Sequence, residues 1–346
     1  MDIKRMIGRS VTARAWAKIN LTLQVTEKLS CGLHLLQSLM CPIDFADDVS
    51  VKITECPGIS LNCSFADEFG EHCRALALLT PKLKTSLESL STESNLASLA
   101  AKAFLERVGL SDKVGIIITL HKRIPLQAGL GGGSSDAAAV LRSLGQLFGY
   151  PVSSGVVQDI ACRLGSDVLP QLTNQLVFAF GTGRNIVPVT IIASAWNIWR
   201  EIAVVVVKPL LSIDTPGAYR SLEFEPSGLA QLDECNRLCE QDRISEILNE
   251  FSEVLVPMGL HFEATVTSHQ NDNKKLTLLE QEGSHAMPAE ALKTANLFDS
   301  FVNDFEKALL KSSSGFSELF ELLKASGAER VLLAGSGSAV LGFSSS

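Results

Sequence analysis

Apolar and polar residues alternate along several short segments of the chain, and this alternation predicts strands. Residues 12–25 and 48–53 follow a period of two, which is the repeat of side chains along a β-strand. A compact apolar run at 114–120 and the segment 175–180 also predict strands, and the apolar run at 203–207 indicates a buried strand. We therefore expect a sheet in the first half of the chain and at least one strand in the second.

Helical spacing separates and follows these strands. Apolar residues recur three or four positions apart over 95–108, 137–148 and 156–164, and again over 297–310 and 316–325. Each of these five segments is predicted to be an amphipathic helix. A mixture of such helices with short strands is typical of an α+β protein.

Two stretches have no clear period. Residues 56–92 mix Cys, Pro, Gly and acidic residues, and residues 269–288 are polar, so both are expected to be loops, the first with one helix at most. An apolar run at 331–334 leads into a late glycine turn at 335–338. The composition after about residue 200 becomes more acidic and helical.

Length and composition indicate a globular protein of two domains, which we place at 1–200 and 201–346. Hydrophobic residues make up 46% and charged residues 20% of the chain, enough to bury a full core. The formal net charge of -8 argues against a broad nucleic-acid-binding surface.

The cysteines and the apolar runs indicate in which cellular compartment the protein is expected. The eight cysteines include no CxxC pair, and the closest two, Cys235 and Cys239, lie in a polar stretch, which disfavours a zinc site. No apolar run near the start is long enough for a signal peptide or a membrane span. We expect a cytoplasmic protein with free thiols and no membrane partner.

A glycine-rich loop, residues 129–135, lies between the strand at 114–120 and the helix that follows. Consecutive glycines let backbone N–H groups approach an anion closely, and the start of a helix adds unpaired N–H groups and a positive dipole end. A plain turn is the alternative, but Gly131, Gly132 and Gly133 in a row are costly in backbone entropy if they only turn the chain. The loop therefore predicts a phosphate site.

Two common phosphate-binding patterns are excluded. The Walker loop requires Gly-Lys-Ser/Thr, but Gly133 is followed by Ser134. The dinucleotide fingerprint requires a glycine at 134 or 136, where the chain has Ser134 and Asp136.

The segment Pro125–Ser135 closely resembles the phosphate loop of the GHMP small-molecule kinases. A first strand, Ala15–Leu21, and the late glycine turn, Ala334–Val340, resemble two further motifs of this family in the same order. The resemblance implies a two-domain α+β fold, with an N-terminal ribosomal-protein-S5-like β/α domain and a C-terminal ferredoxin-like domain. It also implies ATP with Mg²⁺, and Ser135 as a weak candidate metal ligand. The implied ATP-binding residues are Asn95, Lys122, Pro125, Leu126, Gln127, Ala128, Gly129, Leu130, Gly131, Gly132, Gly133, Ser134 and Ser135.

The resemblance further implies the catalytic residues. Asp167 is expected to be the general base toward a substrate hydroxyl, and Lys18 its cationic neighbour. Without the resemblance, Asp167 would be interpreted as a helix N-cap and Lys18 as a solvated lysine on a strand. Asn20 follows Lys18 by two residues, so both side chains share one face of the strand, and Asn20 is expected to contact the substrate.

Within the family, residues 32–38, 165–168 and 215–219 resemble the kinases that act on a cytidine-diphosphate-linked methylerythritol. This implies phosphorylation of its 2-hydroxyl in the non-mevalonate route to isoprenoid precursors. His34 is expected to bind the cytosine edge and Tyr219 to stack on the ring, with Thr215 nearby. These kinases usually have Gly-Tyr-His where this chain has Gly32-Leu33-His34, so one aromatic partner of the base is absent.

Other departures leave alternatives open. These kinases usually read Asp-Val-Pro, whereas here Leu169 separates Val168 from Pro170, and they continue beyond the point where this chain stops at Ser346. The second domain is therefore expected to close differently or to be shortened. The alternatives are a GHMP kinase of the homoserine or mevalonate type, or a non-catalytic nucleotide-binding sensor on the same fold. The expected partner is a small molecule rather than nucleic acid, and we expect a monomer or homodimer.

Overall fold

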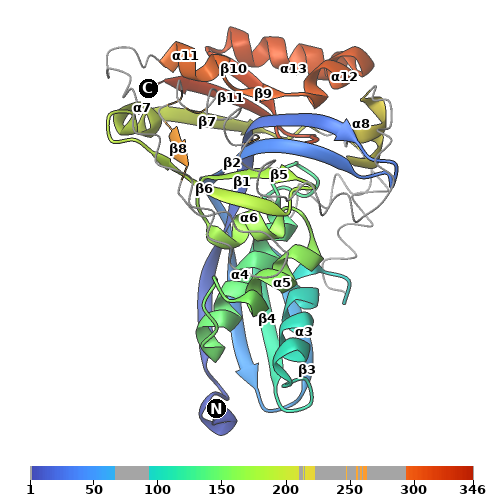
Figure 1. Cartoon of the computed structure of the whole chain (residues 1–346), viewed down its shortest axis with the longest axis vertical. Helices are drawn as coiled ribbons and strands as arrows, with labels where there is room; N and C mark the ends of the chain where they lie inside the picture. Colours follow the sequence, from blue (N-terminus) through green and yellow to red (C-terminus); the bar gives the residue numbers. More distant parts are fainter. Residues whose placement is uncertain are drawn as a thin grey trace. The chain divides into compact units, whose positions relative to one another are not determined.

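Figure 1 shows the fold in a computed structural model of the chain. It describes residues 2–66, 93–209, 213, 215–222, 247, 255, 258, 260–262 and 294–345, so most of the expected loop at 56–92 and all of that at 269–288 lie outside the described residues. Helices and strands are mixed along the chain, which confirms the α+β class.

The chain forms two compact units that are not contiguous in sequence. The first comprises Met1–Lys18 and Pro42–Asn174, and the second comprises Ile19–Cys41 and Gln175–Ser346. Two long strands, β1 (Ser10–Lys28) and β2 (His34–Thr54), each continue from one unit into the other. The division at residue 200 stays a prediction about domain organisation.

The first unit has a sheet that begins at the edge strand β3 (Gly58–Phe65). β3 pairs in parallel with β4 (Gly115–Lys122), and β4 pairs antiparallel with the end of β2, where Asp48 lies opposite His121. The interpretation of this part of 56–92 as a loop is wrong. The side chains of β3 alternate only between exposed and half-buried, because an edge strand buries little, so its sequence lacks a strong apolar period.

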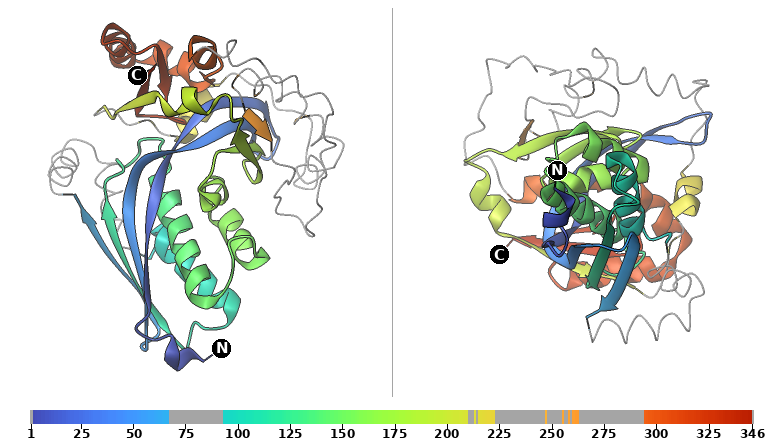
Figure 2. Two further views of the ribbon diagram at one scale, coloured as in Figure 1. Left: turned by 90° about the vertical axis from the view of Figure 1, so that its left-hand side faces the viewer. Right: turned by 90° about the horizontal axis from the view of Figure 1, so that it is seen from below.

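The described part of the first unit includes the helices α3 (Leu96–Val108), α4 (Gly132–Phe148), α5 (Gly155–Leu164) and the six-residue α6 (Val168–Thr173). The first three confirm the predicted helices, whereas α6 is too short to show a period. Figure 2 (left) shows the longer helices on one face of the strands. The core between them includes Phe104, whose ring lies 5.6 Å from that of Phe148 and 5.7 Å from that of Tyr150.

The described strands of the second unit pair in two groups. The first part of β2 pairs with β5 (Val177–Gly181), β5 with β6 (Asn185–Ile191), and β6 with β8 (Leu260–Phe262), all antiparallel. β1 pairs in parallel with the short β9 (Val302–Asn303). The second group is antiparallel, with β11 (Val340–Ser345) between β10 (Arg330–Leu333) and β7 (Ile202–Val207).

The predicted helix at 297–310 is wrong, because the chain breaks there. α11 (Thr294–Asp299) ends, β9 follows, and α12 (Phe305–Ser312) begins. Asn303 causes the break: its amide nitrogen donates to the carbonyls of Leu333 and Gly335, and its amide oxygen accepts from the N–H of Phe305.

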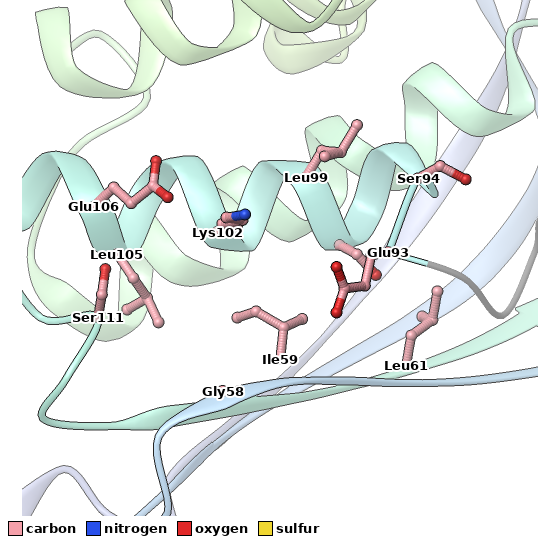
Figure 3. A pocket seen from close by; sticks show the side chains of 11 residues that line it. Gly58, Ile59, Leu61, Glu93, Ser94, Leu99, Lys102, Leu105, Glu106 and Ser111 are labelled. Carbon is pink, nitrogen blue, oxygen red and sulfur yellow. The ribbon is translucent and has the colours of Figure 1, made fainter.

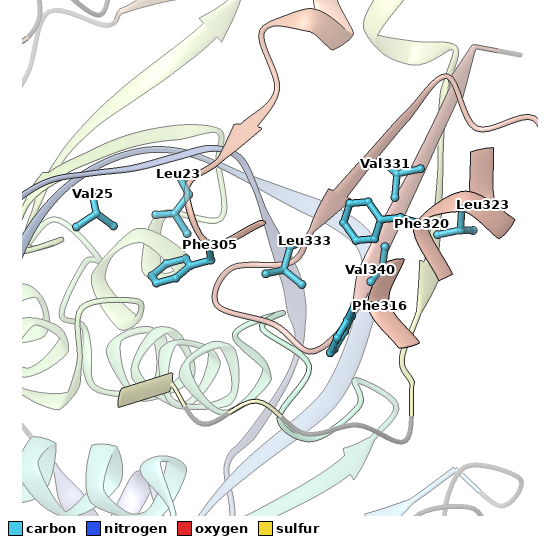
Figure 4. Packing of buried hydrophobic residues seen from close by; sticks show 9 residues of the cluster. All are labelled: Leu23, Val25, Phe305, Phe316, Phe320, Leu323, Val331, Leu333 and Val340. Atoms are coloured by element: carbon cyan, nitrogen blue, oxygen red, sulfur yellow. The ribbon is translucent and has the colours of Figure 1, made fainter. Parts of the chain in front are cut away.

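Three further helices complete the described part of the second unit: α7 (Trp196–Arg200), α8 (Thr215–Ser221) and α13 (Ser314–Ala325), and the last of these confirms the predicted helix at 316–325. A buried apolar cluster joins α12 and α13 to the strands of this unit (Figure 4). Its members are Leu23, Val25, Phe305, Phe316, Phe320, Leu323, Val331, Leu333 and Val340.

Candidate active site

The glycine loop ends where α4 begins. Gly129 and Gly131 have φ angles of 79° and 67°, a backbone region that favours glycine. The helical hydrogen bonds start with Ser135, whose N–H donates to the Gly131 carbonyl at 2.8 Å. The preceding N–H groups of the first turn have no acceptor within the helix, so they are suited to an anion.

Close packing, in addition to backbone conformation, requires glycine at position 131. A Cβ atom there would lie 2.6 Å from Nε2 of Gln171 and 3.0 Å from side-chain carbons of Lys18. At Gly132 a Cβ would lie 3.0 Å from Cγ2 of Ile124. Gln127 has a φ of 53°, which is uncommon for a residue other than glycine and shows that its surroundings fix the loop backbone.

Lys18 and Asp167 form an ion pair beside this loop. Their Nζ and Oδ2 atoms are 3.3 Å apart, with the lysine side chain 8% exposed and the carboxylate 38% exposed. The backbone N–H of Lys18 donates to the Leu130 carbonyl at 3.0 Å, which fixes the strand against the loop. Asp167 occupies the N-cap position of α6, but its side chain makes no capping hydrogen bond. Asp167 thus has the N-cap position of the alternative interpretation without its capping hydrogen bond, and the interpretation of Lys18 as a solvated lysine is wrong because its side chain is buried.

Lys122 is not a solvated charge. Its side chain is 1% exposed, and its ammonium lies 2.5 Å from carboxylate oxygens of both Asp47 and Asp136. Asp47 also accepts hydrogen bonds from the N–H groups of Arg123 and Ile124, where the chain leaves β4 for the loop. The triad of Asp47, Lys122 and Asp136 thus joins strands β2 and β4 to α4 near its start. A direct contact of Lys122 with ATP stays a prediction, and its ammonium is already held by two carboxylates.

Two carboxylates compete for the one ammonium of this triad. Asp47 has two backbone donors in addition, whereas Oδ1 of Asp136 is buried with no hydrogen-bond partner among the described residues. Burial, opposed by Lys122 and reinforced by Asp47, raises the pKa of Asp136 to about 7. Asp136 is thus the member of the triad that takes up a proton near neutral pH.

This gives a testable pH dependence. Below about pH 4 the Asp136 carboxyl is protonated in both the folded and the unfolded chain. Between about pH 4 and pH 7 only the folded chain keeps this proton, so the stabilisation that the bound proton gives the fold is lost as the pH rises across that range. Relative to an Asp136→Asn variant, we expect the wild type to lose free energy of unfolding, of the order of 1 kcal/mol or more, between pH 5 and pH 8. Urea unfolding at several pH values measures this, and a constant difference between the two proteins would contradict it.

Two other predicted ATP-site residues have structural contacts. The Ser135 hydroxyl is buried and donates to the Trp16 carbonyl at 2.7 Å, which connects α4 to β1. A metal contact through its oxygen stays a prediction. The Asn95 side chain accepts from the N–H of Ala97 at 2.9 Å and caps α3. An adenine contact by Asn95 stays a prediction.

A pocket of about 510 Å³ lies between β3 and α3 and was not foreseen from the sequence (Figure 3). One end is formed by Glu93 and Ser94, directly before Asn95. Because the pocket combines residues of an edge strand without a clear pattern and of a helix more than thirty residues later, no local signal indicates it. Its walls are Gly58, Ile59, Leu61, Glu93, Ser94, Ser98, Leu99, Lys102, Leu105, Glu106 and Ser111.

The predicted base-binding residues belong to the second unit. The rings of His34 and Tyr219 contact each other, with centroids 4.8 Å apart and planes tilted by 35°. Burial, together with the charge of Lys28, lowers the pKa of His34, so the imidazole is neutral at neutral pH. Leu33 is 47% exposed. The side chain of Thr215 lies outside the described residues.

Asn20 is buried in the same unit. Its amide nitrogen donates to the Ser38 hydroxyl at 2.7 Å, and that hydroxyl donates to the Thr22 carbonyl. A contact between Asn20 and the substrate stays a prediction. The late glycine turn connects β10 to β11.

Comparison with known proteins identifies the family. The GHMP kinases N terminal domain matches residues 95–182, a range that contains the glycine loop and Asp167. The 4-diphosphocytidyl-2-C-methyl-D-erythritol kinase of Chlorobaculum tepidum is 30% identical over 332 residues, covering 95% of this chain and 87% of that relative. The chain belongs to the 4-diphosphocytidyl-2-C-methyl-D-erythritol kinase family.

Solved structures agree with membership of this kinase family. A crystal structure of a 4-(cytidine 5'-diphospho)-2C-methyl-D-erythritol kinase is 25% identical, with a TM-score of 0.57 over 96% of this chain and 90% of that one. Homoserine kinase from Cytophaga hutchinsonii, 18% identical with a TM-score of 0.56 over 97% of this chain and 85% of that one, shares the fold. The predicted GHMP kinase fold and the prediction of a small-molecule kinase are confirmed.

No helix in the described part of the chain is long and apolar enough to cross a membrane. Cys235 and Cys239 lie outside the described residues.

Proposed function

We propose that this chain transfers the γ-phosphate of ATP to the 2-hydroxyl of 4-diphosphocytidyl-2-C-methyl-D-erythritol, in the non-mevalonate route to isoprenoid precursors. The observation that carries the proposal is the Lys18–Asp167 ion pair beside the glycine loop, where Lys18 also contacts the loop through its backbone. The substrate assignment is supported by the name of the Chlorobaculum tepidum relative.

In the proposed reaction each residue has a role that its surroundings favour. Asp167 is partly exposed, so its carboxylate is accessible to a hydroxyl and can accept the proton as the oxygen attacks phosphorus. The ammonium of Lys18 stabilises the carboxylate and the negative charge of the transferring group. The N–H groups at the start of α4 hold the phosphates in place.

Mg²⁺ is expected to arrive with ATP. Kinases usually hold this ion on the phosphate oxygens with few protein ligands, and it lowers the charge of the phosphates when bound. The Ser135 hydroxyl donates its hydrogen to the Trp16 carbonyl, so only its oxygen lone pairs would face the ion, and Asp136 is buried against Lys122. The residue roles proposed above do not depend on a metal ligand from the chain.

The base of the substrate is proposed to bind at His34 and Tyr219. A neutral imidazole can both donate and accept, which suits the edge of a cytosine, and an aromatic ring offers a stacking face. In the structure these two rings lie against each other, and Tyr219 packs edge-on against Phe305 at 4.9 Å. Homoserine and mevalonate have no base for this pair to bind, which disfavours a kinase of the homoserine or mevalonate type.

Leu33 gives a direct test of this site. Because a stacked aromatic ring contributes about 1 to 3 kcal/mol, we expect Leu33→Tyr to lower the KM for the cytidylyl substrate about tenfold. The KM for ATP is expected to stay the same and serves as an internal control. Steady-state kinetics with each substrate varied in turn measure both values, and an unchanged KM for the cytidylyl substrate would contradict the assignment of this site.

The function is tested by following ADP. Purified protein with ATP and Mg²⁺ is expected to release ADP when the cytidylyl substrate is added, and not with homoserine or mevalonate. ATP binding without turnover on any of the three would favour the nucleotide-binding sensor. The Lys18–Asp167 ion pair beside the glycine loop argues against such a sensor.

We place the reaction in a reducing compartment, the cytoplasm. The cysteines in the described residues are free thiols, and two of them, Cys31 and Cys56, are exposed. Free exposed thiols persist where disulfides do not form.

A further inference from the structure

Gln171 lies between the two halves of the candidate site. It belongs to α6, four residues after Asp167, and is 8% exposed. Its amide nitrogen donates to the Gly131 carbonyl at 3.0 Å and to the Asp167 carbonyl at 3.2 Å. One side chain thus links the backbone of the phosphate loop to the backbone of the proposed base.

Neither carbonyl depends on this side chain for a hydrogen bond. The Gly131 carbonyl already accepts from the N–H of Ser135 at 2.8 Å, and the Asp167 carbonyl accepts from the backbone N–H of Gln171 at 3.4 Å. The amide oxygen of Gln171, by contrast, is buried and has no partner among the described residues. A buried acceptor without a partner destabilises the fold, so stability alone does not account for a glutamine here.

The backbone that carries this side chain is fixed in turn. The Arg142 guanidinium, on α4, donates to the Gln171 carbonyl at 2.9 Å and to the Arg14 carbonyl at 2.8 Å. Because Gln171 lies against the position of Gly131, where even a Cβ would clash with its amide, its side chain has little freedom to move. The amide therefore acts as a short, rigid connection.

We propose that Gln171 is a positioning residue that sets the distance between the phosphate loop and Asp167, an inference that rests on the proposed function. Phosphoryl transfer depends on holding the base, the hydroxyl and the phosphorus in line, and small misplacements in such sites reduce turnover strongly. Substrate binding itself does not require the connection, because the loop N–H groups and the ion pair remain.

The test uses Gln171→Met, which keeps the length of the side chain and removes both hydrogen bonds. We expect kcat to fall about tenfold or more with both KM values within about twofold, and the thermal midpoint to stay unchanged or rise, since the unpaired oxygen is also removed. Gln171→Glu replaces the donor by acceptors that face two carbonyl oxygens, and its kcat is expected to be lower still. The matched control is Gln158→Met on α5, whose half-buried side chain makes no hydrogen bond among the described residues; it should behave as wild type.

Amide hydrogen exchange gives a readout that does not require turnover. Faster exchange in the loop and around Asp167 is expected in Gln171→Met and not in Gln158→Met. The proposal is overturned if Gln171→Met keeps wild-type kcat and exchange, or if kcat falls only as much as the folded fraction does. Wild-type protein that turns over none of the substrates would contradict the proposed function instead, and exchange would still decide whether Gln171 holds the two segments together.

Discussion

Asp167→Asn is expected to lose turnover by a factor of about 10² to 10⁴, the range that a general base contributes. Asparagine has nearly the same shape but cannot accept the hydroxyl proton as a carboxylate does. It also loses the charge that pairs with Lys18 across 3.3 Å. Because the Asp167 side chain makes no capping hydrogen bond and is partly exposed, we expect the variant to fold normally.

The exposed Asp112→Asn, which removes a carboxylate far from any predicted motif, is the matched control and should keep wild-type kcat. Circular dichroism and the thermal midpoint check that the Asp167 variant is folded. If Asp167→Asn retained kcat within a few-fold of wild type, Asp167 would not be the base.

Lys122→Met is expected to cause the largest loss of stability. The lysine is buried between Asp47 and Asp136, and removing it leaves two carboxylates in the interior without a counter-charge. Breaking a buried ion pair from one side costs about 3 to 5 kcal/mol, which is a large part of the stability of a typical domain. Urea unfolding at pH 7 measures the loss as a lower midpoint.

A second substitution distinguishes charge from packing. In the double variant Lys122→Met with Asp136→Asn one carboxylate is gone, so part of the lost free energy should return. The same exchange at the exposed Lys113 is expected to change the midpoint little, because a surface lysine contributes little. A Lys122→Met protein as stable as wild type would show that the triad does not support the first unit.

The sequence predicted secondary structure best where the spacing of apolar residues within a single helix or strand is regular. α3 buries one face and α4 is buried on nearly all sides, and the apolar spacing within each segment was enough to predict both helices. The helix predicted at 297–310 failed because Asn303 bonds to carbonyls of Leu333 and Gly335, thirty residues or more away. Such long-range hydrogen bonds leave no local pattern.

In the candidate site, too, local features could be predicted from the sequence and long-range contacts could not. The glycine loop could be predicted from the sequence because the residues that bind a phosphate there are consecutive. Lys18 and Asp167 came from a resemblance, and the structure places them together. The partnership of Lys122 with Asp47 joins residues 75 positions apart on two strands, and nothing local to either residue indicates it. Gln171 was missed for the same reason.

The most direct test of the proposed reaction is to observe the transferred phosphate by ³¹P NMR in a mixture of protein, ATP, Mg²⁺ and the cytidylyl substrate. We expect a new phosphomonoester signal on the substrate that grows in equal amount with ADP, and that is nearly absent with Asp167→Asn. ADP accompanied only by inorganic phosphate, or a phosphomonoester formed equally well on homoserine or mevalonate, would contradict it.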